Sequence, residues 1–310
     1  MLSIFRVIVA GAAVVILWAS VFPAIRFAAP EFDPVGLSLI RLVVAAAALV
    51  PLAIYRKVRL PARRDLLLIT AAAAFGMAGY QLLENTGELS APAGTTSVII
   101  SAAPLVSFGI AAVAFKERLT MSRLLGSGIA LGGVIVVAMG EAQFSLSTDM
   151  WIVVAAMAVQ GIYHPLSRLL LRTYNPLEVA TYAMVAGTFM TLPLLAFDWE
   201  QFSVASGSAW LGAAYLGIFP SAVGFLLWGY VVARLPLVTS TSLLYFVPPV
   251  AILLSYLWLG EASRVSDALG AAIILIGVIG ISQGNRIVDF FRRRGAGPVV
   301  AGPAPAQGES

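Results

Sequence analysis

Two apolar segments of the chain, 92–115 and 236–259, carry the same spacing of polar residues and proline. The matched residues are Ser97, Ser101 and Pro104 in the first segment and Thr241, Tyr245 and Pro248 in the second. Positions i, i+4 and i+7 lie on one face of a helix. Each proline frees a carbonyl group, which in lipid must face protein or water. The pattern predicts two polar walls that contact a solute, with Pro104 and Pro248 as hinges; plain adaptation of helix packing is the alternative.

Segments 66–87 and 208–232 place polar side chains opposite aromatic ones. The candidates for substrate contact are Tyr80, Gln81, Glu84 and Asn85 in the first segment and Phe225 and Trp228 in the second. Glu84 is the most informative, because a carboxylate within a membrane is costly and generally functional. A solvated helix end beside Glu88 is the alternative. Arg41 is the basic residue inside a predicted helix, and we expect it to reach outward to water or to hold a structural partner, with binding of a substrate carboxylate as the alternative.

Segments 7–25 and 150–170 contribute a third group of candidates. They are Trp18, Gln160, Tyr163 and His164. His164 is the only histidine of the chain, and a group that titrates near neutral pH makes proton coupling a hypothesis. The alternative is a hydrogen-bonded packing residue beside Pro165. Trp18 is interpreted as a cavity residue or as an ordinary packing or interfacial aromatic.

The usual groups of enzyme chemistry are missing from the sequence. With no cysteine and one histidine, the chain has no disulfide framework, no thiolate metal site and no paired-histidine metal motif. It also lacks a Gly-rich phosphate loop and a Gly-x-Ser-x-Gly nucleophile elbow. We therefore expect a non-enzyme that uses no cofactor and no metal and is not driven directly by ATP.

The composition is typical of a protein that lies in a membrane. Of 310 residues, 60% are hydrophobic and 11% charged, whereas a soluble domain carries about 25% charged residues. Because the basic residues occur in short clusters between apolar segments, nucleic acid is not an expected partner. Crossing helices need about 20 apolar residues each. Ten such blocks follow one another: 7–25, 36–54, 66–87, 92–115, 122–140, 150–170, 176–196, 208–232, 236–259 and 267–283.

The positions of the cations predict the orientation. If the N-terminus is cytoplasmic, 16 of the 19 basic residues fall in cytoplasmic segments, while Arg26 and Arg264 fall outside and Arg41 lies within a helix. Positive charge is retained on the cytoplasmic side, so the pattern favours ten crossings with both termini in the cytoplasm. The basic, Gly- and Pro-rich residues 286–310 are typical of a disordered tail. A cleaved secretory signal in the first block is the alternative to a first crossing.

The second half of the chain repeats the first. A shift of 144 residues superimposes Pro92 on Pro236, Pro104 on Pro248, Glu117 on Glu261, Gly126 on Gly270 and Gly133 on Gly277, and a shift of 142 superimposes Pro23 on Pro165 and Pro34 on Pro176. The repeats are expected at 1–144 and 145–285. Since five crossings is an odd number, the two repeats must be inverted, which is a common construction of transporters. Duplication that produced a scaffold or an integral enzyme is the alternative.

At this point the sequence resembles a known family. Phe115-Lys116-Glu117-Arg118-Leu119-Thr120, its partner Trp258-Leu259-Gly260-Glu261 and Ile40-Arg41-Leu42 are similar to the EamA-type branch of the drug/metabolite transporter superfamily. The resemblance covers about residues 7–284. It implies a ten-helix, five-plus-five inverted-repeat carrier with a central cavity, and members that export amino acids or other small metabolites across the bacterial inner membrane. The two repeats differ where Lys116 of the first aligns with Gly260 of the second. Residues 7–25 also lack the acidic residue of the small drug-cation antiporters of this superfamily.

We interpret the chain as an inner-membrane exporter of small metabolites, with amino acids favoured, that works by alternating access. Aromatic rings would cover the apolar part of the substrate, from Trp18, Tyr163, Trp228 and Tyr245, and polar groups would bind the rest, from Gln81, Ser101, Gln160 and Thr241. A multidrug exporter and a membrane scaffold or lipid-handling protein are the alternatives. The expected partners are a small-molecule substrate and the lipid bilayer. The sequence does not choose between proton coupling and facilitated diffusion, or between a monomer and a weak homodimer.

Overall fold

The computed structural model describes residues 2–28, 30–90, 93–114, 120–140, 148–195, 199–260, 265–266, 268–277 and 280. The predicted tail at 286–310 and the loop residues Glu117 and Glu261 lie outside this part of the chain.

The described chain is helical throughout, as predicted. The α-helices are α1 (Leu2–Ala19), α2 (Val21–Ala28), α3 (Pro34–Tyr55), α4 (Leu66–Ala73), α5 (Tyr80–Ser90), α6 (Ala93–Ile100), α7 (Ala103–Ala114), α8 (Met121–Gly140), α9 (Thr148–Leu170), α10 (Pro176–Thr191), α11 (Glu200–Val204), α12 (Gly207–Leu216), α13 (Phe225–Val232), α14 (Leu237–Ser242) and α15 (Val247–Leu259). Short 3-10 segments are η1 (Arg63–Asp65), η3 (Leu192–Leu195) and η5 (Leu243–Phe246), and π-helical segments are η2 (Ala74–Gly79) and η4 (Gly217–Gly224). A further apolar helix covers Ala268–Gly277.

Seven helical stretches of the described residues are long and apolar enough to cross a membrane. They are Ile4–Arg26, Pro34–Tyr55, Arg63–Leu89, Thr96–Ala114, Pro176–Leu195, Gly207–Val232 and Leu237–Leu259. The other three predicted blocks contain α8, α9 and the helix at 268–277. The chain is therefore an all-α protein of the membrane type, while ten crossings and the orientation of the termini stay predictions.

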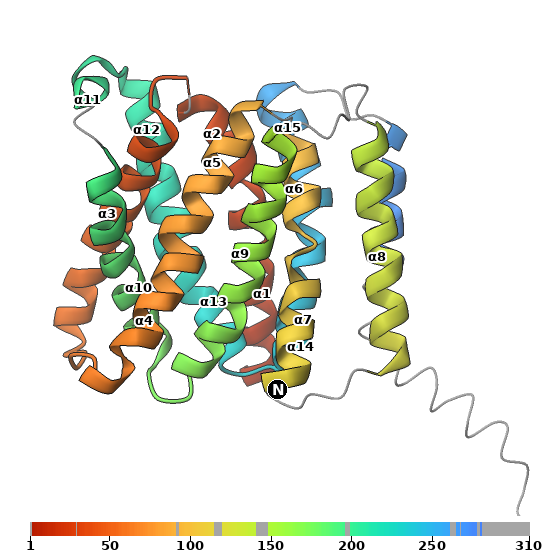
Figure 1. The fold of residues 1–310 in the computed structure, drawn as a ribbon, viewed down its shortest axis with the longest axis horizontal. Coiled ribbons are helices and arrows are strands. Elements are labelled where there is room, and N and C mark those ends of the chain that lie inside the picture. Colours follow the sequence, from red (N-terminus) through yellow and green to blue (C-terminus); the bar gives the residue numbers. More distant parts are fainter. Residues whose placement is uncertain are drawn as a thin grey trace, which may run out of the picture.

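The helices stand side by side in one bundle (Figure 1). The N-terminal end of α1 lies at the same end of the bundle as α14, and α11 and α15 reach the opposite end (Figure 1). The main apolar core joins segments from both halves of the chain, with Phe22, Met77, Tyr163 and Trp228 among its fully or almost fully buried members. A second cluster packs α2 against α12.

Helix starts in the two halves are built alike. Asp33 accepts a hydrogen bond from the Gly36 N–H at the start of α3, and Asn175 accepts one from the Glu178 N–H at the start of α10. Both helices have proline in their first turn, where a missing N–H costs nothing. The two caps are related by the 142-residue shift. The repeat in the sequence therefore appears in the structure as a repeated helix start.

The irregular parts of the crossings also recur. The π-helical segments η2 and η4 overlap when the 144-residue shift is applied, and so do the interruption between α6 and α7 and the 3-10 segment η5. Pro104 and Pro248 lie in the first turns of α7 and α15, directly after these interruptions. The prolines thus sit where each helix changes course, and their role as hinges stays a prediction.

Four glycines bring α8 and the helix at 268–277 into close contact. A Cβ atom added to Gly133 would lie 2.6 Å from the backbone oxygen of Gly270, and one added to Gly277 would lie 2.5 Å from that of Gly126. The earlier residue of one helix meets the later residue of the other, so the two helices are antiparallel. Since the 144-residue shift relates both pairs, repeat-equivalent helices run in opposite directions here, which supports the predicted inversion.

One end of the bundle carries cations that hold neighbouring segments together, and one of them joins the two halves. The Arg59 guanidinium lies 3.3 Å from the Glu178 carboxylate and 4.9 Å from the centre of the Tyr174 ring. Arg168 donates hydrogen bonds to backbone carbonyl groups of the loop at 232–235. These loops are among those that the sequence places in the cytoplasm.

Acidic side chains join the halves at the opposite end. The Asp33 N–H donates to the Gln201 side-chain oxygen at 3.0 Å, and the Gln201 amide donates to the Asp33 carboxylate at 2.9 Å. Ser206 donates to the Glu31 carboxylate through both its N–H and its hydroxyl, and these hydrogen bonds lower the pKa of Glu31. Asp33 and Glu31 thus join the two halves at this end.

Candidate substrate cavity

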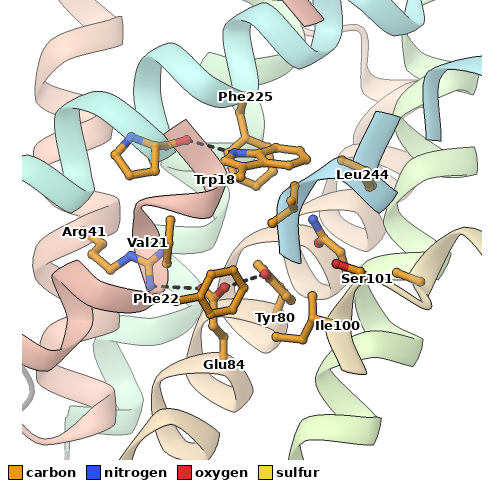
Figure 2. A pocket seen from close by; sticks show the side chains of 14 residues that line it. Trp18, Val21, Phe22, Arg41, Tyr80, Glu84, Ile100, Ser101, Phe225 and Leu244 are labelled. Atoms are coloured by element: carbon orange, nitrogen blue, oxygen red, sulfur yellow. Dashed lines mark hydrogen bonds and ion pairs between the residues drawn. The ribbon is translucent and has the colours of Figure 1, made fainter. Parts of the chain in front are cut away.

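A small cavity lies in the middle of the bundle, which we call the central cavity (Figure 2). Its lining residues are Trp18, Val21, Phe22, Arg41, Tyr80, Glu84, Ile100, Ser101, Ala103, Gln160, Pro220, Phe225, Leu244 and Val247. Both halves of the chain contribute to it. Six residues predicted to contact substrate therefore share one cavity: Trp18, Tyr80, Glu84, Ser101, Gln160 and Phe225.

Aromatic rings form one side of the central cavity. The Trp18 ring centre lies 5.1 Å from that of Phe225 and 5.3 Å from that of Trp228. The indole N–H of Trp18 donates to the Pro220 carbonyl at 3.2 Å. A Cβ on Gly224 would lie 2.8 Å from the indole nitrogen, so only glycine lets the π-helical segment η4 approach the ring this closely. The indole is thus held in position in the wall of the central cavity.

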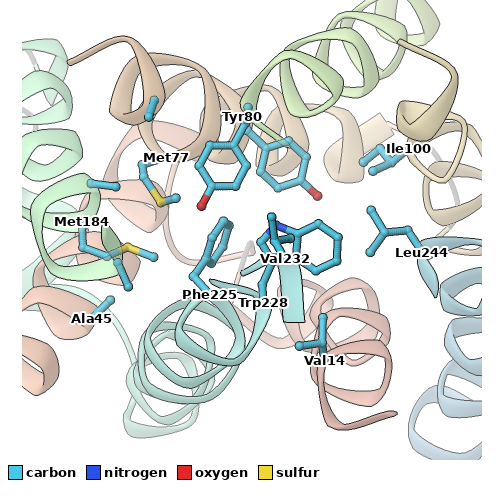
Figure 3. Packing of buried hydrophobic residues seen from close by; sticks show 14 of the residues in the cluster. Val14, Ala45, Met77, Tyr80, Ile100, Met184, Phe225, Trp228, Val232 and Leu244 are labelled. Atoms are coloured by element: carbon cyan, nitrogen blue, oxygen red, sulfur yellow. The ribbon is translucent and has the colours of Figure 1, made fainter. Parts of the chain in front are cut away.

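Three more predicted residues form a layer behind the lining. The His164 ring lies 4.9 Å from Trp228, and the Tyr163 ring lies 5.6 Å from Phe225. Phe225 and Trp228 lie together in the centre of the buried cluster (Figure 3). Neither ring nitrogen of His164 has a hydrogen-bond partner among the described residues. The ring is fully buried, as the alternative of a packing histidine required, and the role of His164 stays a prediction.

A buried ion pair forms part of the other side. The Arg41 Nη1 lies 3.1 Å from the Glu84 Oε2 and donates to the Asn85 side-chain oxygen at 2.6 Å. The Tyr80 hydroxyl donates to the Glu84 Oε1 at 2.5 Å, and the Asn85 amide donates to the Ser38 hydroxyl at 2.8 Å. Every member of this network is at least 90% buried. A buried charge requires such partners, because they replace the water molecules that would otherwise solvate it.

These contacts correct two expectations from the sequence. The Arg41 side chain is 2% exposed, so it does not reach outward to water, and it holds a partner as the other interpretation required. Glu84 is 2% exposed and Glu88 is 1% exposed, so neither lies at a solvated helix end. Glu88 instead lies 3.7 Å from Arg26, whose side chain is 32% exposed. The partners of Glu84 and Glu88 come from distant parts of the chain. Their position near a helix end was therefore compatible with contact to solvent when the sequence alone was considered.

The remaining predicted residues lie away from the central cavity. Gln81 is fully buried, and neither end of its amide has a partner among the described residues. Ser97 accepts the Ser101 hydroxyl through its carbonyl group, and Thr241 donates to backbone carbonyls of its own helix. Tyr245 packs with Val98 and Ile274 in a separate apolar cluster. Contact of these four residues with a substrate stays a prediction.

Several lining residues were missed as site candidates. The largest is Phe22, which is almost fully buried and adjoins the cavity in α2. Pro220 was missed as well, and its place inside a crossing helix was a signal that could have found it, since proline there frees carbonyl groups. The apolar lining residues Ile100, Leu244 and Val247 have no signal that distinguishes them from other core residues.

No group of three or more potential metal ligands occurs among the described residues. The central cavity offers aromatic faces, hydroxyl and amide groups and one ion pair. Such a set can bind a small molecule that has an apolar part and charged or polar groups.

The chain matches a family model twice, at residues 5–139 and 146–283, and the model describes the EamA-like transporter family. A relative in Streptantibioticus cattleyicolor, named "Probable terminal-alkyne amino-acid exporter", is 44% identical over 92% of this chain and 95% of its own. The transporter YdfC of Bacillus subtilis is 31% identical over 84% of this chain and 86% of its own.

More distant comparisons agree. The inner membrane transporter YedA of Escherichia coli K12 is 24% identical over 93% of this chain and 92% of its own. A crystal structure of 21% sequence identity has a TM-score of 0.75 and covers 91% of this chain and 98% of that chain, which shows a shared fold. The earlier resemblance is confirmed by the double match and by the first relative. This chain belongs to the EamA-like transporter family, a family of membrane transporters and not of enzymes.

Proposed function

We propose that this protein exports amino acids across the bacterial inner membrane by alternating access through the central cavity. The observation that carries the proposal is the composition of that cavity: aromatic rings on one side and the buried pair Arg41–Glu84 on the other. The 44% identical relative, named for amino-acid export, supports the substrate class. The name of the relative in Escherichia coli supports the inner membrane as the location.

The lining suits a molecule with one apolar end. Trp18, Phe22 and Phe225 offer the broad apolar contacts that an aliphatic or aromatic side chain needs, while Ser101 and Gln160 offer hydrogen bonds. No covalent step is required of these residues. Transport then depends on binding and on a change of access.

The size of the cavity supports a change of shape during transport. Its volume of about 40 Å³ has room for a few water molecules and not for an amino acid. We therefore propose that the described conformation is a closed one, and that the halves separate at one end of the bundle to admit the substrate. The polar contacts at the two ends, Arg59–Glu178 and Asp33–Gln201, are positioned to close those ends.

The proposed topology has ten crossings with both termini in the cytoplasm and repeats at 1–144 and 145–285. The two matches of the family model lie within these ranges. The antiparallel contact of repeat-equivalent glycines supports the inversion. The cations Arg59 and Arg168 lie near the ends of crossings, as retention of positive charge on the cytoplasmic side requires.

The proposal is tested with purified protein in liposomes loaded with the twenty common amino acids. Efflux is followed by mass spectrometry of the external medium, and protein-free liposomes give the leak. We expect a subset of amino acids, those with apolar side chains first, to leave faster than the leak. A multidrug exporter would release a lipophilic dye and no amino acid, and a scaffold would release neither, so either result would refute the proposal.

The same liposomes decide between proton coupling and facilitated diffusion. An imposed pH gradient drives an amino acid against its own concentration gradient only if protons move with or against the substrate. The buried titratable groups next to the substrate are Glu84 in the lining and His164 behind it. If coupling occurs, His164→Gln or Glu84→Gln is expected to remove the dependence on the gradient.

A further inference from the structure

Resting on the proposed function, we propose that Arg41 and Glu84 together recognise the charged end of a zwitterion. In this arrangement the substrate carboxylate binds the Arg41 guanidinium, and the substrate ammonium group binds the Glu84 carboxylate. The ion pair between the two side chains opens to admit both groups and closes again when the substrate leaves.

Both side chains line the central cavity, and they come from different helices. Arg41 projects from α3 and Glu84 from α5, and both line the cavity. The pair lies apart from Trp18 and Phe225, which leaves the aromatic side to the apolar part of the substrate (Figure 2). Because the two charges come from different side chains, rotation of the Glu84 carboxylate away from Arg41 can widen the gap between them while Asn85 keeps α3 and α5 joined.

Each charge has a neutral partner that does not depend on the other charge. Asn85 accepts from Arg41 at 2.6 Å and is itself fixed by its hydrogen bond to Ser38. Tyr80 donates to Glu84 at 2.5 Å. When the ion pair opens, both side chains therefore keep one hydrogen bond and their orientation. The two helices thus hold a preformed pair of opposite charges with its own supports.

Arg41 also has a spare donor. Its Nε is buried and has no hydrogen-bond partner among the described residues. A guanidinium binds a carboxylate best through two parallel N–H donors, and the Nε is one of the donors that can complete such a pair. A substrate carboxylate would satisfy an atom that the closed pair leaves without a partner.

Charge balance makes the site selective for zwitterions. A bound zwitterion supplies one negative and one positive group, so every buried charge keeps a partner of opposite sign. An amine without a carboxylate would compete with Arg41 for Glu84, and one positive charge would be left without a partner. An acid without an amino group would compete with Glu84 for Arg41, and one negative charge would be left without a partner. Buried charges without partners are strongly unfavourable. The pair therefore admits amino acids and rejects the corresponding amines and acids.

A second ion pair provides a matched control. Arg26 and Glu88 lie 3.7 Å apart on neighbouring elements, but neither lines the central cavity, and the Arg26 side chain is 32% exposed. Removal of both charges there alters the electrostatics of the same region without altering the cavity wall.

The test measures inhibition of labelled phenylalanine uptake into proteoliposomes by phenylalanine, phenethylamine and 3-phenylpropanoate. For the wild-type protein we expect phenylalanine to inhibit at least tenfold better than either analogue. Glu84→Gln is expected to shift the preference at least tenfold toward 3-phenylpropanoate, because an unpaired guanidinium remains. Arg41→Gln is expected to shift it toward phenethylamine, because an unpaired carboxylate remains.

A double variant keeps the test decisive if a single variant fails to fold. Arg41→Gln/Glu84→Gln removes both buried charges, and it is expected to lose the discrimination against the two analogues, whereas Arg26→Gln/Glu88→Gln is expected to keep it. Unchanged discrimination in the Arg41/Glu84 variants would overturn the inference. If the wild-type protein moves no amino acid at all, including phenylalanine, both the proposed function and this inference fail. If the wild-type protein moves amino acids and all variants keep its preference, only this inference fails.

Discussion

The indole of Trp18 is held from several sides in the cavity wall. Its ring is tilted against those of Phe225 and Trp228, and its N–H donates to the Pro220 carbonyl. The side chain is only half-buried, so its truncation removes a cavity surface without opening a large void in the core. Its main role is therefore expected in substrate contact.

We predict that Trp18→Ala lowers amino-acid uptake at least tenfold, while Trp18→Phe has a smaller effect because an aromatic face remains. Uptake into proteoliposomes, normalised to the amount of reconstituted protein, checks this. Trp151→Ala is the control, since Trp151 is 58% exposed on α9 and lies outside the cavity lining. Equal uptake by Trp18→Ala and the wild type would remove Trp18 from the site.

At this scale the sequence predicted part of the cavity. Six of its predicted residues line the wall, because polar side chains within crossing helices tend to face inward and away from lipid. It did not predict that Arg41 and Glu84 meet, because they are 43 positions apart and the pairing depends on how two helices turn toward each other. Ser97 and Thr241 show the opposite case: their hydroxyl or carbonyl groups serve their own helices, which spacing alone does not reveal.

Among the helices, the crossing of α8 with the helix at 268–277 gives the clearest prediction. A methyl group on Gly133 or Gly277 would meet backbone atoms of the other helix, which cannot rotate away. We predict that Gly133→Ala and Gly277→Ala destabilise the protein by about 1 to 3 kcal/mol. The melting temperature in detergent would then fall by several degrees.

The neighbouring residue Gly132 is the control for this prediction. An added Cβ there has no atom within 4 Å, so Gly132→Ala is expected to leave the melting temperature unchanged or to raise it, since alanine favours a helix. A lower melting temperature for Gly132→Ala than for Gly133→Ala would contradict the close crossing.

Helix boundaries and interruptions were partly predictable. Asp33-Pro34 and Asn175-Pro176 predict helix starts, and Pro104 and Pro248 predict the interruptions beside them, because proline constrains the backbone locally. The π-helical segments were not predicted. Segment η2 depends on the close approach of Gly76 to the Tyr163 ring, where a Cβ would lie 2.1 Å from a ring carbon. That contact joins distant segments and leaves no local pattern.

At the scale of the whole molecule, two inverted five-crossing repeats with a cytoplasmic N-terminus require that the connection between them lies on the outer side of the inner membrane. We predict that alkaline phosphatase fused after Gly140 is active and that a green fluorescent protein fused there is dark, with the reverse result for fusions after Tyr55. Activity and fluorescence in intact bacteria check this. Fluorescence after Gly140 would place the connection in the cytoplasm and would contradict the inversion.

The overall fold class was predictable because composition and hydrophobic periodicity show whether a chain is surrounded by lipid or by water. A content of 11% charged residues cannot cover a soluble particle, and the repeat relates Gly126 to Gly270 and Gly133 to Gly277, which the structure brings into reciprocal contact. The conformation was not predictable from the sequence. The cavity volume of about 40 Å³ depends on the packing of side chains from distant segments, which local sequence patterns do not specify.

Counterflow tests most directly whether the central cavity is exposed to one side of the membrane at a time. Proteoliposomes are loaded with an excess of an unlabelled amino acid, and a trace of the labelled form is added outside. We expect the labelled amino acid to accumulate transiently above its external concentration in wild-type vesicles and hardly at all with Trp18→Ala. Absence of accumulation with the wild type, under conditions where the protein is folded and inserted, would contradict alternating access through the central cavity.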